Sequence, residues 1–272
     1  AELMARVHTL LRVKRLYDTV QSQAAELKRW SAELEQRVAA EVDRNQRLTR
    51  LQRFFSPALA QRLLTDEAES VLASHRREIV VVFLDLRGWT AFSETAEPEE
   101  VMQALAEYHS LMGERVQAAE GTIERFNGDG LMVFFNDPLP QPDAAVRALD
   151  MALAMQRDAA RLQRSWRTRG FDLALGIGVA QGFATLGRIG FEGRIDYGAI
   201  GPVTSLAFRL CGVAAAGEVL ATTRVLTAAE QGGCTALDGC ARAMHGPMSL
   251  HGFSRPIEIV GLRAKVPAHE AQ

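Results

Sequence analysis

The sequence predicts an α/β domain, a mixed-sheet sandwich with covering helices, preceded by a long helix. Strand and helix patterns alternate from about residue 76 onward, which is typical of helices packed on a sheet. The first 70 residues differ in character, because they contain no glycine and a single proline, Pro57. Apolar residues in that segment recur at helical spacing, so it is expected to form one long helix.

A heptad-like seam runs through the N-terminal segment. Its positions alternate spacings of four and three, with one polar member, which is typical of a two-stranded coiled coil: Leu16, Val20, Gln23, Leu27, Trp30 and Leu34. The alternative is a helix packed on its own domain. The dimeric coil is favoured because a long charged helix gains most of its stability from packing.

The chain is expected to divide into five parts. Residues 1–17 resemble the last helix of a response-regulator receiver domain, although a generic amphipathic helix is an alternative for this short stretch. The chain starts in mid-helix character, so we expect it to be a piece of a longer protein with an upstream receiver or sensor domain. A coiled-coil signalling helix follows at 18–55, then a linker helix at 56–75, the α/β domain at 76–263 and a tail at 264–272.

Within the α/β domain, apolar runs, helical periodicity and turn residues place the elements in order. Pro98 fits the first turn of a helix, and a proline-rich loop at 138–142 interrupts regular structure. Strands are expected at 79–84, 122–126, 131–135, 173–180, 185–189, 218–222 and 257–262, and helices at 98–119, 143–167 and 203–213.

Two aspartates stand at places where carboxylates can converge. Asp85 ends the apolar run 79–84, and Asp129 lies in the tight turn Asn127-Gly128-Asp129-Gly130. Turn geometry alone is an alternative reason for Asp129, because Asn-Gly and Asp-Gly are strong hairpin signals. A carboxylate at a strand end and another at a hairpin tip can hold Mg²⁺, which prefers a few carboxylates plus substrate phosphates. The pair therefore indicates chemistry on a nucleotide.

Four collinear motifs resemble the class III nucleotidyl cyclases, in both order and spacing. They lie at 85–90, 125–135, 196–201 and 206–210. The resemblance covers residues 76–263. It implies an enzyme in which two metal ions, Mg²⁺ or Mn²⁺, activate the ribose 3′-hydroxyl for in-line attack on the α-phosphorus and neutralise the departing pyrophosphate. The expected reaction is conversion of ATP to cyclic AMP in a homodimer.

The resemblance also assigns residues to roles. Asp85, Leu86 and Asp129 are the expected metal-site residues of one chain, and Arg125, Ser205 and Arg209 are expected to come from the other chain. The guanidinium fork of Arg209 suits charge on the α-phosphate better than an ammonium does, and Ser205 projects from the same helix face.

Phosphate contacts are expected from two further places. Backbone amides from Leu86 to Thr90, including Gly88 and Trp89, could cradle phosphate at a turn and helix terminus. Arg194 resembles a position that contacts the terminal phosphates, with a simple loop charge as the alternative. Arg87 is expected to be a solvated loop side chain.

The chain departs from the family pattern at four positions. Ser205 stands for the transition-state asparagine and Arg125 for the adenine-reading lysine. Gly198 stands for the aspartate, threonine or cysteine that partners this lysine, and His251 for a phosphate-binding lysine. Without a side chain at Gly198, weak base discrimination is expected. The alternatives are therefore a guanylate cyclase making cyclic GMP, or a weak or silent cyclase-like domain retained for dimeric signalling.

Net charge, cysteine content and hydropathy indicate which classes of partner and which compartment the chain fits. With 31 basic and 33 acidic residues the net charge is -2, so no strongly basic field favours nucleic acid as a partner. The three cysteines form no CxxC pair, which indicates neither a disulfide framework nor a zinc site and favours a reduced cytoplasm. No apolar run approaches the ~20 residues that a membrane-spanning helix needs.

Overall fold

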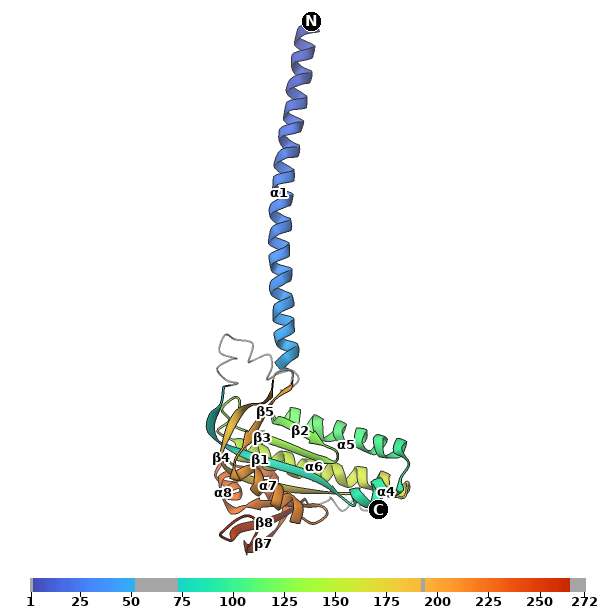
Figure 1. Ribbon diagram of the computed structural model, residues 1–272, viewed down its shortest axis with the longest axis vertical. Coiled ribbons are helices and arrows are strands. Elements are labelled where there is room, and N and C mark those ends of the chain that lie inside the picture. The colour runs from blue at the N-terminus through green and yellow to red at the C-terminus, as the bar shows by residue number, and fades with distance from the viewer. Residues whose placement is uncertain (1, 52–72, 192–193, 265–272) are drawn as a thin grey trace. The chain divides into compact units, whose positions relative to one another are not determined.

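The computed structural model describes residues 2–51, 73–191 and 194–264 of the chain (Figure 1). The chain forms two units, residues 1–51 and residues 52–272. The predicted linker helix at 56–75 and tail at 264–272 lie almost wholly outside the described residues. Among those that are described, no helix has the length and apolar character needed to cross a membrane.

The first unit is a single helix, α1 (Glu2–Leu51). The apolar seam residues described along it, from Leu16 through Leu34, are all exposed by half or more. A long helix with an exposed apolar stripe is what the coiled-coil hypothesis requires, because such a stripe is normally buried by a partner. The helix is therefore confirmed, and its pairing stays a prediction.

The second unit is built on one mixed sheet. Its strands follow the order β2-β3-β1-β4-β6-β8-β7, with β5 paired to β4 outside this path. All pairings are antiparallel except β4 with β6. The strands are β1 (His75–Arg87), β2 (Thr122–Asn127), β3 (Gly130–Phe135), β4 (Ala174–Phe191), β5 (Arg194–Ile200), β6 (Glu218–Thr222), β7 (Cys240–Met248) and β8 (Ile257–Ala264).

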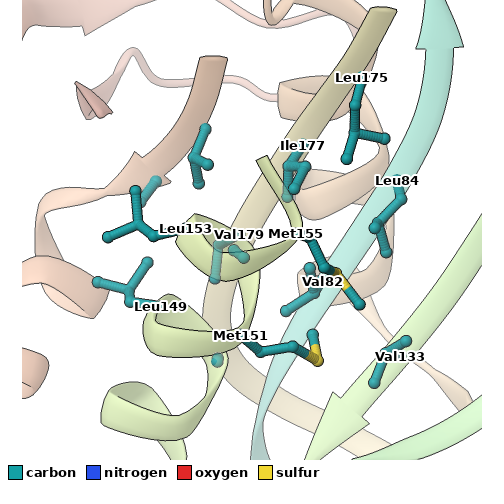
Figure 2. Packing of buried hydrophobic residues seen from close by; sticks show 14 of the residues in the cluster. Val82, Leu84, Val133, Leu149, Met151, Leu153, Met155, Leu175, Ile177 and Val179 are labelled. Carbon is teal, nitrogen blue, oxygen red and sulfur yellow. The ribbon is translucent and has the colours of Figure 1, made fainter. Parts of the chain in front are cut away.

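One face of the sheet carries the main core. Figure 2 shows Met155 of the long helix α6 (Ala144–Thr168) beside Val82 of β1, and Leu149 and Leu84 belong to the same buried cluster. Burying these side chains stabilises the fold by roughly 1.5–3 kcal/mol each. The helices of the second unit are α4 (Trp89–Thr95), α5 (Pro98–Ala118), α6 (Ala144–Thr168), α7 (Pro202–Val213), α8 (Thr223–Gln231) and the short 3₁₀ helix η1 (Thr235–Gly239).

Helix α7 lies on the other face. Successive side chains of a strand point to opposite faces, so Phe83 faces away from α6, and its ring meets that of Phe208 on α7 at a centroid distance of 5.5 Å. Asp85 shares the side of Phe83. The sheet therefore separates the layer of α5 and α6 from the face that α7 covers. Asp85 lies on this second face, where its side chain can reach solvent.

Several expectations need correction. The strands predicted at 173–180 and 185–189 are one continuous strand, β4, because Gln181 and Gly182 continue the ladder opposite Val80 and Ile79 of β1. The sequence analysis also missed α4, β5, α8, η1 and β7. In β7 the apolar pattern is weak, since this edge strand is mostly exposed, and edge strands carry little periodic signal.

Gly178 sets how closely α7 approaches the sheet. A Cβ atom at this position would overlap the backbone N of Cys211 and O of Ala207, and would lie 2.9 Å from the Cα of Cys211. Only a residue without a side chain allows this spacing. The position of α7, and of the residues that it carries, therefore depends on this glycine of β4.

We predict that Gly178→Ala lowers the free energy of unfolding by about 1–3 kcal/mol through overpacking against the α7 backbone. The matched control is Gly113→Ala on α5, where nothing lies within 4 Å of the added Cβ and the change should gain up to about 1 kcal/mol of helix stability. Urea denaturation of both variants measures the difference. Equal stability for the two would show that α7 shifts without cost.

Candidate active site

Asp85 lies near the carboxyl end of β1, between two apolar residues that face the main core. Leu84 and Leu86 are 0% and 3% exposed, whereas the Asp85 side chain is 40% exposed. Alternation along the strand thus buries the leucines and turns the carboxylate toward the opposite face. The carboxylate of Asp85 therefore lies at the end of β1, and the burial of Leu84 and Leu86 on either side holds its backbone in place.

Asp129 lies in the turn that joins β2 to β3. Asn127 pairs with Gly130 across this turn, and Gly128 adopts a left-handed φ of 63°, which a glycine tolerates without strain. Because Leu84 pairs with Leu131, the turn lies beside the end of β1. There the backbone N–H of Leu86 donates to Oδ2 of Asp129 at 3.3 Å. The hairpin and the strand end thus meet, as the sequence predicts.

The two carboxyl groups are close enough to share a proton. Burial, the negative charge of Asp85 and a hydrogen bond with Asp85 together raise the pKa of Asp129 from 3.8 to about 6. Two carboxyl groups in hydrogen-bonding contact cannot both ionise without an electrostatic cost. A cation between them removes that cost, so this arrangement fits a metal site.

Helix α5 supports the Asp129 turn. His109 is hydrogen-bonded through Nε2 to the carbonyl oxygen of Gly128 at 2.9 Å, and its ring lies 4.6 Å from that of Phe126. The next residue inward, Tyr108, is 1% exposed. Burial raises the pKa of Tyr108, and the nearby carboxylates of Asp129 and Asp85 raise it further.

The hydroxyl of Tyr108 has no hydrogen-bond partner among the described residues. A buried hydroxyl without a partner costs about 1–3 kcal/mol. Helical periodicity alone marks Tyr108 only as a residue of the apolar face of α5, because periodicity does not distinguish a hydroxyl that faces a site from one that is only buried.

The donor set fits a divalent ion of the Mg²⁺ class. Within residues 2–51, 73–191 and 194–264 no group of three or more histidine, cysteine or acidic side chains gathers, so a closed protein cage is not present there. Mg²⁺ is normally held by one or two carboxylates together with substrate phosphates. Asp85 and Asp129 provide that pair, and Leu86, whose side chain is buried, reaches the site only through its main chain.

Arg87 corrects the sequence analysis. It is not a solvated loop residue: its side chain is 26% exposed, and one guanidinium nitrogen donates to Oδ2 of Asp85 at 2.6 Å. The rest of the fork donates to the carbonyl oxygens of Ala214 and Cys211 at the end of α7. Arg87 therefore joins α7 to β1 and supplies positive charge to Asp85, a role invisible in sequence because α7 lies more than 100 positions away.

Ser205 and Arg209 stand one helical turn apart on α7, and both are exposed. The Arg209 guanidinium lies 5.6 Å from the centre of the Phe208 ring. In the part of the chain that is described, neither residue makes a hydrogen bond or ion pair with Asp85 or Asp129. Within the described part of a single chain the aspartates are thus brought together, and no hydrogen bond or ion pair joins Ser205 or Arg209 to them.

Arg125 and Gly198 lie on β2 and β5. The Arg125 side chain is 62% exposed, whereas Gly198 is buried. Between them lies the carboxyl group of Glu124, which sequence reasoning did not single out. Its oxygen Oε2 is 3.7 Å from Nε of Arg125.

The remaining predicted residues lie at separate places. Gly88 has a left-handed φ of 85° and precedes α4, and Thr90 is exposed in the first turn of that helix. Trp89 packs on the ring of Phe92 at 5.5 Å. His251 is exposed in the turn between β7 and β8, and Arg194 begins β5 but its side chain lies outside the description.

A mixed sheet whose strand end and hairpin tip present paired carboxylates defines a class of metal-dependent nucleotide enzymes. Comparison with known proteins gives the family. Residues 71–253 match the sequence profile of the adenylate and guanylate cyclase catalytic domain. The chain belongs to this family.

Two relatives illustrate the similarity. Adenylate cyclase 1 of Rhizobium meliloti is 32% identical over 182 residues, 61% of this chain and 27% of that protein. An adenylate cyclase of Anabaena cylindrica is 34% identical over 146 residues, 52% of this chain and 28% of that protein. The chain thus spans under a third of the length of these relatives.

Solved structures have the same fold. The adenylyl cyclase CyaB of P. aeruginosa is 33% identical with a TM-score of 0.66, over 72% of this chain and 98% of that one. A guanylyl cyclase is 29% identical with a TM-score of 0.63, over 72% and 96% of the two chains. The mixed sheet with covering helices predicted from the sequence is therefore confirmed as the class III cyclase fold.

We predict that Asp129→Asn stabilises the metal-free protein above pH 6. The raised pKa means that the folded state binds more protons than the unfolded state between about pH 4 and pH 6, so wild-type stability falls as pH rises through this window. After allowance for solvent screening of this half-buried group, the gain is on the order of 1 kcal/mol. Melting temperatures from pH 4 to 8 in a chelator measure it.

The exposed Asp172→Asn serves as the control for net charge. Added Mn²⁺ at pH 7.5 should raise the melting temperature of the wild type and of Asp172→Asn, and not that of Asp129→Asn, because a ligand stabilises only a state that binds it. Equal metal stabilisation of all three proteins would contradict the metal-site assignment.

Proposed function

We propose that this chain is a nucleotidyl cyclase domain that converts ATP to 3′,5′-cyclic AMP and pyrophosphate as a homodimer. The observation that carries the proposal is the meeting of the Asp85 and Asp129 carboxyl groups, with their perturbed protonation, at the rim of an apolar sheet. Two carboxyl groups held together against their mutual repulsion, with a raised pKa, are expected at a functional site. Membership of the cyclase family names the chemistry to which this pair is suited.

In the proposed reaction the ribose 3′-hydroxyl oxygen bonds to the α-phosphorus. The bond from this phosphorus to the oxygen that bridges the α- and β-phosphates breaks, pyrophosphate leaves with that oxygen, and the hydroxyl proton passes to water. Asp85 and Asp129 would hold the divalent ions, with the main chain of Leu86 beside them. Mg²⁺ or Mn²⁺, two per site, supplies Lewis acidity to the attacking and leaving oxygens.

Other groups of the chain orient the substrate. Arg209 donates to the oxygens of the α-phosphate, where charge builds up in the transition state. Ser205, with its shorter side chain, reaches the ribose through water. The N–H of Leu86 is bonded to Asp129, so the main-chain N–H groups of Gly88, Trp89 and Thr90 face the phosphates. Arg194 and His251 are further phosphate contacts.

A homodimer is supported by the exposure of Ser205 and Arg209 on α7, together with the absence of hydrogen bonds or ion pairs between them and the aspartates among the described residues. In the proposed dimer a second copy provides Arg209 and Ser205 to the substrate that Asp85 and Asp129 hold. Large apolar side chains, each more than half exposed, lie on the strands and helix of this part of the molecule: Phe183, Phe191, Ile200, Phe208 and Val213. Exposed apolar residues gathered in this way mark interaction surfaces.

A silent signalling domain is the second candidate, favoured by the ion pair between Arg87 and Asp85. An internal cation on a metal ligand competes with the metal. Turnover of purified protein with ATP, GTP, CTP and UTP, in Mg²⁺ and in Mn²⁺, decides among the candidates. Cyclic AMP formation supports the proposal, cyclic GMP alone supports a guanylate cyclase, and no product with any nucleotide supports the silent domain.

We predict that Asp85→Ala and Arg209→Ala are each inactive alone, with at least about a 100-fold loss, and that mixing them restores activity. In a 1:1 mixture half of the dimers are mixed, and each mixed dimer has one intact site, so about a quarter of wild-type activity is expected. Cyclic AMP formation after subunit exchange measures it. No recovery, with exchange shown by labelled subunits, would mean that one chain supplies both Asp85 and Arg209 to a site.

The helix α1 is proposed to pair with its copy and to transmit a signal from an upstream receiver or sensor domain in the cytoplasm. A small rotation of one subunit would misalign the halves of each site, and a displacement near one ångström costs on the order of 100-fold in rate. The exposed seam from Leu16 to Leu34 is the observation that supports pairing.

We predict that activity depends on the phase of this seam. Seven residues inserted after Leu34 roughly restore the phase and should preserve activity, whereas three or four shift the register and should change it severalfold. Cyclic AMP production by the three variants is compared, with dimerisation checked by sedimentation. If all three dimers are equally active, α1 acts as a tether only.

A further inference from the structure

The space beside Gly198 is filled by a side chain from another strand. A Cβ atom built on Gly198 would lie 2.5 Å from Oε1 of Glu124 and 2.9 Å from Cδ1 of Ile189. The same Oε1 accepts a hydrogen bond from the backbone N–H of Ala199 at 3.3 Å. The carboxyl group of Glu124 thus occupies the place that a polar side chain on residue 198 would take.

An irregularity in β2 directs Glu124 to this position. The pairing of β2 with β3 shifts between Ile123 and Arg125, so that Glu124 is an extra residue on its strand. Bulges of this kind re-aim side chains and occur beside functional sites. Here the bulge places two consecutive side chains differently: Arg125 is largely exposed, and the Glu124 side chain is 8% exposed.

The two side chains form an adjacent donor and acceptor. Arg125 offers N–H groups, and Oε2 of Glu124 lies 3.7 Å from its Nε. Burial raises the pKa of Glu124; Arg125 and the N–H of Ala199 lower it, and Asp196 raises it. With one backbone donor on Oε1, this carboxylate has unused acceptor capacity, and a buried acceptor of this kind gains from a further donor.

We infer that Glu124 is a base-selecting residue, whose carboxylate accepts a hydrogen bond from the 6-amino group of adenine while Arg125 donates to the adjacent N1. The inference rests on the proposed function and on the expectation from the sequence that Arg125 of β2 and Gly198 of β5 lie at the base. Guanine presents a carbonyl oxygen at position 6 and N1–H beside it. The Glu124 carboxylate would then face the carbonyl oxygen, acceptor against acceptor, and Arg125 would face N1–H, donor against donor. Gly198 therefore does not imply weak base discrimination, because Glu124 supplies the polar group that Gly198 lacks.

The first test is Glu124→Gln. Glutamine keeps the shape, and its carbonyl oxygen can still accept from Ala199, so the fold is preserved, while its amide group can donate to guanine. The ratio of kcat/KM for ATP to that for GTP should fall by about 10–100-fold. Glu114→Gln, an exposed change on α5, should leave the ratio unchanged. An unchanged ratio in active Glu124→Gln overturns the inference and leaves the proposed cyclase function standing.

The second test moves the carboxylate from one strand to the other. Glu124→Ala should lose ATP preference, and Glu124→Ala combined with Gly198→Asp should regain at least about 10-fold of it, because removal of Glu124 clears the space for a Cβ at residue 198. A role of Glu124 in stability alone predicts no such recovery. Failure of the folded double variant to regain preference counts against the inference.

Binding of the non-cyclisable analogues of ATP and GTP, measured by calorimetry with Mg²⁺, separates this inference from the proposed function. If wild-type protein forms no cyclic nucleotide and still prefers the ATP analogue through Glu124, the proposed function fails and the inference holds. If the wild type is active and binds both analogues equally, the inference fails and the cyclase activity stands.

Discussion

The pairing of two like charges governs the architecture of this domain. Asp85 and Asp129 are brought together at the end of β1, where burial and mutual repulsion raise the pKa of Asp129 to about 6. In the described state the charge of Asp85 is offset by Arg87, and the backbone N–H of Leu86 stabilises the Asp129 carboxyl group. The surrounding elements keep these groups in place: His109 of α5 holds the turn that carries Asp129.

The division of the sheet into two faces follows from the same requirement. Alternation in β1 sends Leu84 and Leu86 into the core beneath α5 and α6 and turns Asp85 toward α7. The α7 layer is held close to the sheet by Gly178, whose missing Cβ admits the backbone near Cys211. A rigid sheet with one fully covered face can therefore present charged and exposed apolar groups on the other face without losing its core.

Arg87 and Glu124 show how contacts between elements distant in sequence position polar side chains. Arg87 is held at the end of α7, and Glu124 is held by Ala199 of β5. The Arg87 guanidinium is satisfied by Asp85 and by the carbonyl oxygens of Ala214 and Cys211. The Glu124 carboxyl group has fewer partners, and a buried polar group of this kind is costly unless a counter-charge or a ligand satisfies it.

The sequence by itself determined the class of fold, the helix before it and the two aspartates. These depend on local rules, because apolar periodicity marks strands and helices and the Asn-Gly-Asp-Gly turn brings its own geometry. The same rules placed Ser205 and Arg209 on one helix face.

Only the tertiary structure decided which distant residues meet. The bulge that turns Glu124 toward Gly198, the ion pair of Arg87 with Asp85 and the unpartnered hydroxyl of Tyr108 all depend on strand register or on packing between elements. None of these leaves a periodic signal, because a contact across elements is fixed by the whole arrangement of the sheet and its helices. For the same reason the sequence read β4 as two strands and Gly198 as a missing side chain, whereas the fold supplies the continuous ladder and the carboxyl group that fills the space.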